Sequence, residues 1–163
     1  MSCSNEPTLQ KYFVEKSEDS NFTNIDLAPS FINTDSIQLT KDEKSALQSF
    51  RKMNVLVFKA NDRNAAKYET EKAQVKALLK DEKYEELIKY NSQGQGASIT
   101  TLGEGDKIDE VVVFVHKADT GFGVIRILSN NMTPNNVLTL AGLVQKANLN
   151  IGQLKPLQEL VKK

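Results

Sequence analysis

Four short apolar runs, separated only by turn residues, occupy the middle of the chain and constrain its fold more than any other feature. The runs cover residues 87–90, 98–102, 108–117 and 122–129. Each separator contains glycine, and none is long enough to hold a helix. Parallel neighbours need a crossover of a dozen or more residues, so consecutive runs must pair antiparallel. The pattern predicts a four-stranded antiparallel meander.

Two further strands are predicted before the meander. Residues 22–27 alternate between the two faces of a strand, and Ala28-Pro29 ends it. Val55–Phe58 is a continuous apolar run, which is typical of a strand that is covered on both faces or is central in its sheet. The sequence leaves open whether these two strands pair with each other through their helix crossover or flank the meander.

Apolar residues at helical spacing predict the helices. The clearest begins at Thr40, because Thr40 and Glu43 form a capping box that satisfies free N–H groups of the first turn. Its inward face is expected to include Phe50 and Met53, with Asn54 as a left-handed stop. The other predicted helices cover residues 9–16 and 65–80, a segment from Thr133-Pro134 with Val137, Leu140, Ala141 and Val144 inward, and a short segment from Pro156.

These elements predict an α+β fold with two layers. We expect a largely antiparallel sheet of about five to six strands, ending in the C-terminal meander, with helices packed mainly on one face. Residues 1–7 are small and polar and are interpreted as a flexible leader or tether. Residues 8–163 are interpreted as a single α+β domain.

Charge and hydropathy exclude two classes of protein. The formal net charge is zero, with 21 basic and 21 acidic residues, whereas nucleic-acid binding rests on a basic surface. No run approaches the roughly 18 apolar residues of a membrane-spanning helix. Nucleic acid is therefore not expected as a partner.

No pattern in the sequence predicts catalysis or metal binding. His116, the only histidine, is expected to be an exposed residue at a strand end, because no partner for a general base is adjacent. One histidine and one distant cysteine do not make a zinc site. Asp119-Thr120-Gly121 has the letters of the aspartic-protease motif, but it falls where a hairpin needs a turn and has no second copy. The acidic stretch 81–86 is interpreted as the solvated end of a helix. We therefore predict no catalytic, cofactor-binding or metal-binding residue.

Cys3 is the most informative single residue. As the only cysteine it cannot form an internal disulfide. It follows the small residue Ser2 and precedes a polar stretch, Ser4–Pro7. A processed bacterial lipoprotein begins with a lipid-modified cysteine followed by a flexible tether of this kind. Cys3 is therefore a candidate lipid-attachment residue.

The body of the chain resembles the bacterial domain-of-unknown-function family 4252. The resemblance extends from about Phe13 to Leu160. It is carried by Tyr84–Ile88, expected to close the middle helix and enter a strand, by Ala97–Thr100, and by Lys107–Val115 with the strand Phe122–Ile127. Members of this family are mostly small envelope lipoproteins without an established activity. The resemblance implies lipid attachment at Cys3 and supplies no catalytic residue.

These observations favour a non-enzymatic, lipid-anchored protein of the bacterial cell envelope, on the periplasmic side or at the surface. Its α+β domain would bind a ligand or an envelope protein, without a cofactor. The alternative is a cytosolic protein-interaction module without an anchor, if Met1 is the true start. A third hypothesis, an enzyme, requires a pocket in which Asp109, Glu110, His116 or Arg126 converge.

Overall fold

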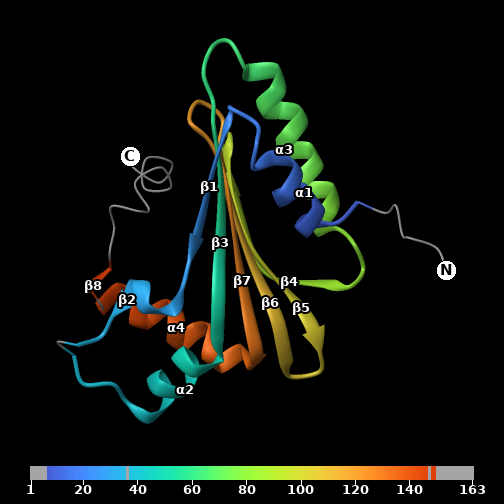
Figure 1. Cartoon of the computed structure of the whole chain (residues 1–163). Helices are drawn as coiled ribbons and strands as arrows, with labels where there is room; N and C mark the ends of the chain where they lie inside the picture. The colour runs from blue at the N-terminus through green and yellow to red at the C-terminus, as the bar shows by residue number, and fades with distance from the viewer. Residues whose placement is uncertain (1–6, 36, 147, 150–163) are drawn as a thin grey trace.

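A six-stranded antiparallel sheet forms the centre of the protein (Figure 1). The computed structural model describes residues 7–35, 37–146 and 148–149. The strand order is β1-β3-β7-β6-β5-β4, so β4 to β7 are consecutive antiparallel neighbours and the predicted meander is confirmed. The strands of the sheet are β1 (Phe22–Leu27), β3 (Phe50–Lys59), β4 (Tyr84–Ser92), β5 (Gln95–Glu104), β6 (Lys107–Lys117) and β7 (Gly121–Met132).

The strand order shows how the first two strands of the sheet, β1 and β3, are paired. β1 pairs with β3, and β3 pairs with β7, the last strand of the meander. This arrangement leaves β1 and β4 as the two edges of the sheet. A second, small sheet pairs β2 (Ile32–Asn33) with β8 (Asn148–Leu149).

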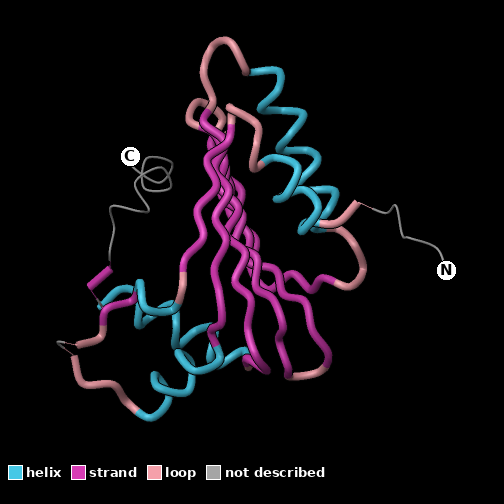
Figure 2. Tube along the Cα trace, in the orientation of Figure 1, coloured by secondary structure: helices cyan, strands magenta, loops and turns pink. Residues whose placement is uncertain are grey.

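Four α-helices and one 3₁₀ turn accompany the sheet in the part of the chain that the structure describes (Figure 2). They are α1 (Leu9–Lys16), η1 (Pro29–Phe31), α2 (Lys41–Ser49), α3 (Ala65–Leu79) and α4 (Pro134–Lys146). The predicted capping box is present, since Thr40 Oγ1 accepts from the Glu43 N–H at 3.1 Å and Glu43 Oε1 accepts from the Thr40 N–H at 2.9 Å. Thr133 caps α4 in the same way, through Asn136. The helix predicted from Pro156 lies outside the described residues.

The helices divide between the two faces of the sheet, which corrects the expectation that they pack mainly on one face. α1 and α3 cover one face and α2 and α4 the other (Figure 1). The alternation of β3 shows why: Leu56 and Phe58 belong to the core under α1 and α3, whereas Val55 and Val57 belong to the core under α2 and α4. The apolar run in β3 is thus covered on both faces, as its sequence indicated.

Three predicted boundaries are wrong. α2 ends at Ser49, and β3 begins at Phe50, so Phe50 and Met53 are strand residues. Asn54 is not a helix stop; it lies inside β3, and its side-chain amide donates to Asp26 of β1. β4 begins at Tyr84, which places the end of the acidic stretch 81–86 in a strand and not in a helix.

One predicted helix face is also wrong in part. Val137 and Leu140 of α4 pack inward as expected, but Ala141 is exposed, and Leu143 is the buried residue of the next turn.

The tripeptide Asp119-Thr120-Gly121 is the turn between β6 and β7. The Thr120 N–H donates to Lys117 O at 3.0 Å and closes the turn. Gly121 has a φ of +133°, and a Cβ on this residue would lie 1.9 Å from Phe58 O of the neighbouring strand. The turn therefore requires glycine for reasons of structure, which confirms the interpretation of this motif.

Candidate functional site

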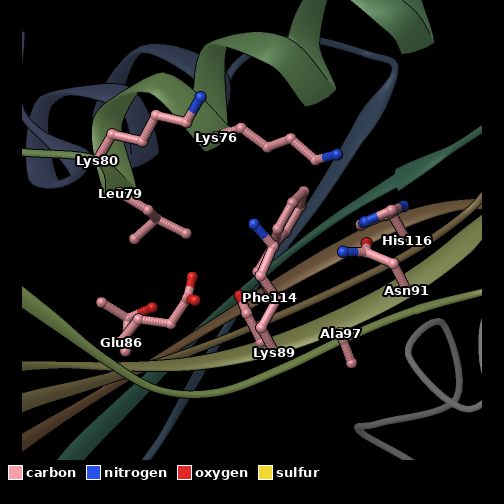
Figure 3. Close-up of a pocket in the computed structure, with 11 residues that line it drawn as sticks. Lys76, Leu79, Lys80, Glu86, Lys89, Asn91, Ala97, Phe114 and His116 are labelled. Carbon is pink, nitrogen blue, oxygen red and sulfur yellow. The ribbon is translucent and has the colours of Figure 1, made fainter.

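A pocket opens between α3 and the β4 side of the sheet (Figure 3). Its volume is about 200 Å³. The residues that line it come from one helix and three strands: Lys76, Leu79 and Lys80 of α3, Glu86, Lys89 and Asn91 of β4, Ala97, Ser98 and Thr100 of β5, and Phe114 and His116 of β6.

The register of the strands brings the floor of the pocket together. Phe114 lies opposite Ser98 in the β5–β6 pair, and His116 lies opposite Gly96. A bulge in β4 after Glu86 changes which β4 residues face α3, so Lys89 lies opposite Ser98. Phe114 is part of the core under α1 and α3, so these residues share the face that α3 covers.

Three lysines surround the pocket, and none of them makes an ion pair or a side-chain hydrogen bond with the part of the chain that the structure describes. In Figure 3 the side chains of Lys76 and Lys89 extend toward the space beside Phe114 and His116, while the Lys80 ammonium turns away. Burial lowers the pKa of Lys76 below its ordinary value, and the positive charges of Lys72, Lys89 and Lys80 lower it further. Lys76 and Lys89 therefore present like charges to the same pocket.

His116 lies inside this pocket, and the expectation that it would be exposed is wrong. Its imidazole packs on the Phe114 ring, with 5.2 Å between the ring centres. The Nδ1 atom is buried and has no hydrogen-bond partner. Burial, followed by the charges of Lys76 and Lys72, lowers the pKa of His116 to about 4. The imidazole is therefore neutral at pH 7.

Gly96 makes room for the imidazole. A Cβ on Gly96 would lie 2.6 Å from His116 Nε2 and 2.7 Å from Asn91 Oδ1. Both distances are far below an ordinary contact, so any larger residue at this position would displace the imidazole or the Asn91 amide. The absence of a side chain at Gly96 thus fixes the shape of this end of the pocket.

The floor also carries two hydroxyl groups without a partner in the described protein. Thr100 is only 2% exposed as a residue, and its side chain makes no hydrogen bond with the protein. Its oxygen is not one of the buried unpaired atoms of the described residues, which are Tyr68 Oη and His116 Nδ1, so it is open to the pocket. Its neighbour on the same face, Ser98, is half-buried and likewise has no side-chain hydrogen bond. The pocket therefore presents several polar groups that the protein itself does not satisfy.

The residues of the enzyme hypothesis do not converge. Glu110 is buried, and its carboxylate accepts from Arg126 Nε at 2.9 Å and from the Tyr84 hydroxyl at 3.2 Å. Burial and then the charge of Glu110 raise the pKa of Tyr84. His116 lies six residues further along β6, roughly 20 Å away at the rise of an extended strand. Asp109 is exposed. Glu110, Arg126 and Tyr84 form a cluster apart from the pocket.

Three other features considered in the sequence are Cys3, metal ligands and membrane-spanning helices. Cys3 lies outside the described residues. Among the described residues, no group of three or more His, Cys, Asp or Glu could hold a metal ion. None of the helices in the described ranges has the length and apolar character needed to cross a membrane.

The sequence did not single out the lysines, Ser98 or Thr100. One signal was available: Lys72, Lys76 and Lys80 recur every four residues and so share one stripe of α3. Which strand residues face that stripe depends on the bulge in β4 and on the strand register. Neither is visible in the sequence.

A family model agrees with the features described. The model named "Domain of unknown function (DUF4252)" matches residues 12–140, from α1 into α4. No curated protein and no solved structure shows significant similarity to the chain. The match covers most of the 163 residues and includes every strand of the six-stranded sheet. The chain therefore belongs to the DUF4252 family.

Proposed function

We propose that this protein is a non-enzymatic, lipid-anchored protein of the cell envelope whose α+β domain binds a ligand in the pocket between α3 and the sheet. One observation carries the binding role: the pocket is lined by the cations Lys76 and Lys89 and by the hydroxyl of Thr100, none of which has a partner within the described protein. Groups of this kind are matched by a bound molecule in ligand sites. The domain is taken to extend over residues 8–163.

The states of His116 and Glu110, the acid and base groups of the enzyme hypothesis, support a binding function and not catalysis. A general base works best when its pKa is near the working pH. The pKa of His116, about 4, makes it a weak base at pH 7. The buried carboxylate of Glu110 is already engaged by Arg126 and Tyr84. His116 and Glu110 are therefore proposed to have structural roles and not to act in acid–base catalysis.

The anchor is proposed at Cys3. Thr8 caps α1, which packs against α3 through a 2.7 Å hydrogen bond from the Tyr12 hydroxyl to Glu71. Five residues separate Cys3 from Leu9, and they can span at most about 17 Å. A lipid on Cys3 would therefore keep the domain close to the membrane surface. The several acyl chains of a bacterial lipoprotein hold firmly, whereas one chain gives only marginal affinity.

Labelled palmitate tests the anchor directly. The full gene, with its natural upstream region, is expressed in the native bacterium as wild type and as Cys3→Ser. We expect the label and the membrane fraction to contain the wild type only. An unlabelled wild-type protein, or upstream DNA without an in-frame apolar segment before Ser2-Cys3, would contradict the anchor.

The competing function is a cytosolic module that docks another protein. The feature that favours it is β4, an edge strand with three exposed apolar side chains, Leu87 (43%), Ile88 (52%) and Tyr90 (53%). Exposed apolar edges are docking sites for other chains. This function predicts that the protein stays in the soluble fraction, and that Tyr90→Lys abolishes capture of the partner. Membrane fractionation of the wild type separates the two functions.

A further inference from the structure

The residues that line the pocket between α3 and β4–β6 carry more positive charge than negative charge. Lys76 and Lys89 extend into it from opposite sides, one from the helix and one from the edge strand (Figure 3). Glu86 is the one carboxylate among the lining residues, and Figure 3 places it beside Leu79, at the end away from His116. The end of the pocket near His116 therefore favours an anion.

Hydrogen-bonding groups surround the same end. The hydroxyl group of Ser98 belongs to the floor opposite Lys89 and Phe114, whereas Thr100 lies opposite Glu86 at the other end. The amide of Asn91 lies beside His116 (Figure 3). None of these three side chains has a hydrogen-bond partner within the described protein. Hydroxyl, amide and ammonium groups can all donate to the oxygens of an anion. A group that fits here must accept several hydrogen bonds from different directions.

Charge and size favour a small phosphate group as the anion. Two ammonium groups are neutralised by one dianionic group, whereas a carboxylate supplies a single negative charge. A phosphate monoester carries close to two negative charges at neutral pH and three acceptor oxygens, and lysine serves as a point charge for phosphate. Drug-sized ligands occupy about 300–1,000 Å³, so a pocket of about 200 Å³ suits a smaller molecule.

We infer that the pocket binds a small phosphate-bearing molecule, with the dianionic phosphate group between Lys76 and Lys89 and its oxygens against Ser98 and Asn91. The inference rests on the proposed ligand-binding function of the same pocket. The phosphate can come from two sources, free inorganic phosphate or a small organic phosphate whose polar remainder extends toward Glu86.

Titration of the full ¹⁵N-labelled chain, followed by NMR at low salt in a phosphate-free buffer, tests the inference. The probes are inorganic phosphate, glycerol 3-phosphate, acetate and glycerol. We expect saturable shifts of the His116 and Ser98 signals with at least one phosphate probe, and at least tenfold weaker binding of acetate. Tighter binding of glycerol 3-phosphate than of inorganic phosphate would identify an organic phosphate as the source; equal or weaker binding would identify the free ion.

Variants locate the bound group. Lys76→Gln and Lys89→Gln remove one positive charge each from exposed side chains, so the fold is retained. Each should weaken phosphate binding at least tenfold, which corresponds to about 1.4 kcal/mol. Lys107→Gln, an exposed strand residue outside the pocket, is the matched control and should bind as the wild type does. Phosphate binding that survives both pocket substitutions would overturn the inference.

Ser98→Ala separates a ligand-binding role from a structural one. Alanine removes a half-buried hydroxyl group that has no partner in the described protein. The variant should melt at the same temperature as the wild type, and it should bind phosphate several-fold more weakly. A lower melting temperature with unchanged phosphate affinity would assign Ser98 a structural role and refute its contact with the anion.

The titration distinguishes failure of the phosphate assignment from failure of the ligand-binding function. If acetate or glycerol shifts the His116 and Ser98 signals and both phosphates fail, the phosphate assignment is wrong and the ligand-binding function survives. If none of the four probes moves these signals, both are rejected.

Discussion

Replacing Glu110 tests the conclusion that the Glu110–Arg126–Tyr84 cluster holds the fold together. Glu110 is 5% exposed, and its two carboxylate oxygens accept from Arg126 Nε at 2.9 Å and from the Tyr84 hydroxyl at 3.2 Å. Glu110→Leu leaves the Arg126 side chain, which is 12% exposed, without its counter-charge. Breaking a buried ion pair in this way costs about 3–5 kcal/mol.

The exposure of Arg126 places the expected cost at the lower end of that range. Water can reach part of its guanidinium group, so we expect Glu110→Leu to lower the free energy of unfolding by about 3 kcal/mol. For a chain of this length, 1 kcal/mol lowers the melting temperature by about 2–4 °C. The variant should therefore melt about 6–12 °C below the wild type.

The double variant Glu110→Leu/Arg126→Met should recover most of this loss. It removes both charges and places apolar side chains on the face that α1 and α3 cover, and such replacements are often neutral or stabilising. The Tyr84 hydroxyl loses its acceptor, at a cost of about 1 kcal/mol. We expect the double variant to unfold within about 1 kcal/mol of the wild type.

Urea unfolding of the wild type, both single variants and the double variant measures the coupling between the two residues. A cycle of this kind isolates the pairwise interaction. A loss below about 1 kcal/mol in Glu110→Leu, or losses that simply add in the double variant, would refute the stabilising role of this ion pair. Either result would free the cluster for another role, and the enzyme hypothesis would regain its buried carboxylate.

Three further predictions concern the core, the capping box and the histidine. Phe58→Ala should cost about 3–5 kcal/mol in urea unfolding, because its fully buried ring contacts the rings of Phe22, Tyr68 and Phe122; a loss below about 1 kcal/mol would contradict this packing. Thr40→Ala should lower stability by about 1 kcal/mol in thermal unfolding, and Thr40→Ser should not. In the folded chain the pKa of His116 is lowered from 6.5 to about 4. Between these two pH values, the imidazole of the unfolded chain therefore binds a proton more readily than that of the folded chain. Stability should therefore fall as the pH drops from 6.5 toward 4, by up to about 1.4 kcal/mol per pH unit from this one group. A wild-type pH slope that His116→Gln leaves unchanged would disprove this assignment.

The sequence predicts the meander well because local chemistry determines it. Glycines stand at the turns, and Gly94, Gly105 and Gly121 have positive φ. The capping box at Thr40 is equally local, since both partners lie within one turn. Features of this kind need no knowledge of the rest of the fold.

The boundary between α2 and β3 could not be predicted in the same way. Phe50 and Met53 fit the helical spacing that begins at Ala46, so the pattern extends the helix past its true end. In the structure, Phe50 lies opposite Ser129 of β7, and Met53 lies opposite Ile127 and Leu27 on its two sides. Pairing with distant strands decides this boundary, and it overrides local propensity.

The first half of β4 gave no strand signal for a different reason. Tyr84–Glu86 belongs to an edge strand whose side chains are mostly exposed, so it needs no alternation of apolar and polar residues. The candidate site escaped prediction because its parts come from α3, β4, β5 and β6. Only the bulge after Glu86 and the register of β5 with β6 bring Lys89, Ser98 and Phe114 to one place.

The pocket is better explained by ligand binding than by the needs of the fold. α3 buries Tyr68, Val75 and Leu78 against the sheet, while its next stripe, with Lys76 and Leu79, overhangs β4 and β5. If stability alone were at stake, larger apolar residues at positions 98 and 100 would fill the space below that overhang. The chain instead carries serine and threonine there, whose hydroxyl groups have no partner in the described protein, and it leaves the buried Nδ1 of His116 unpaired. A buried unpaired nitrogen costs about 1–3 kcal/mol, whereas the hydroxyl groups face the pocket, where an anion beside the lysines can accept from Ser98.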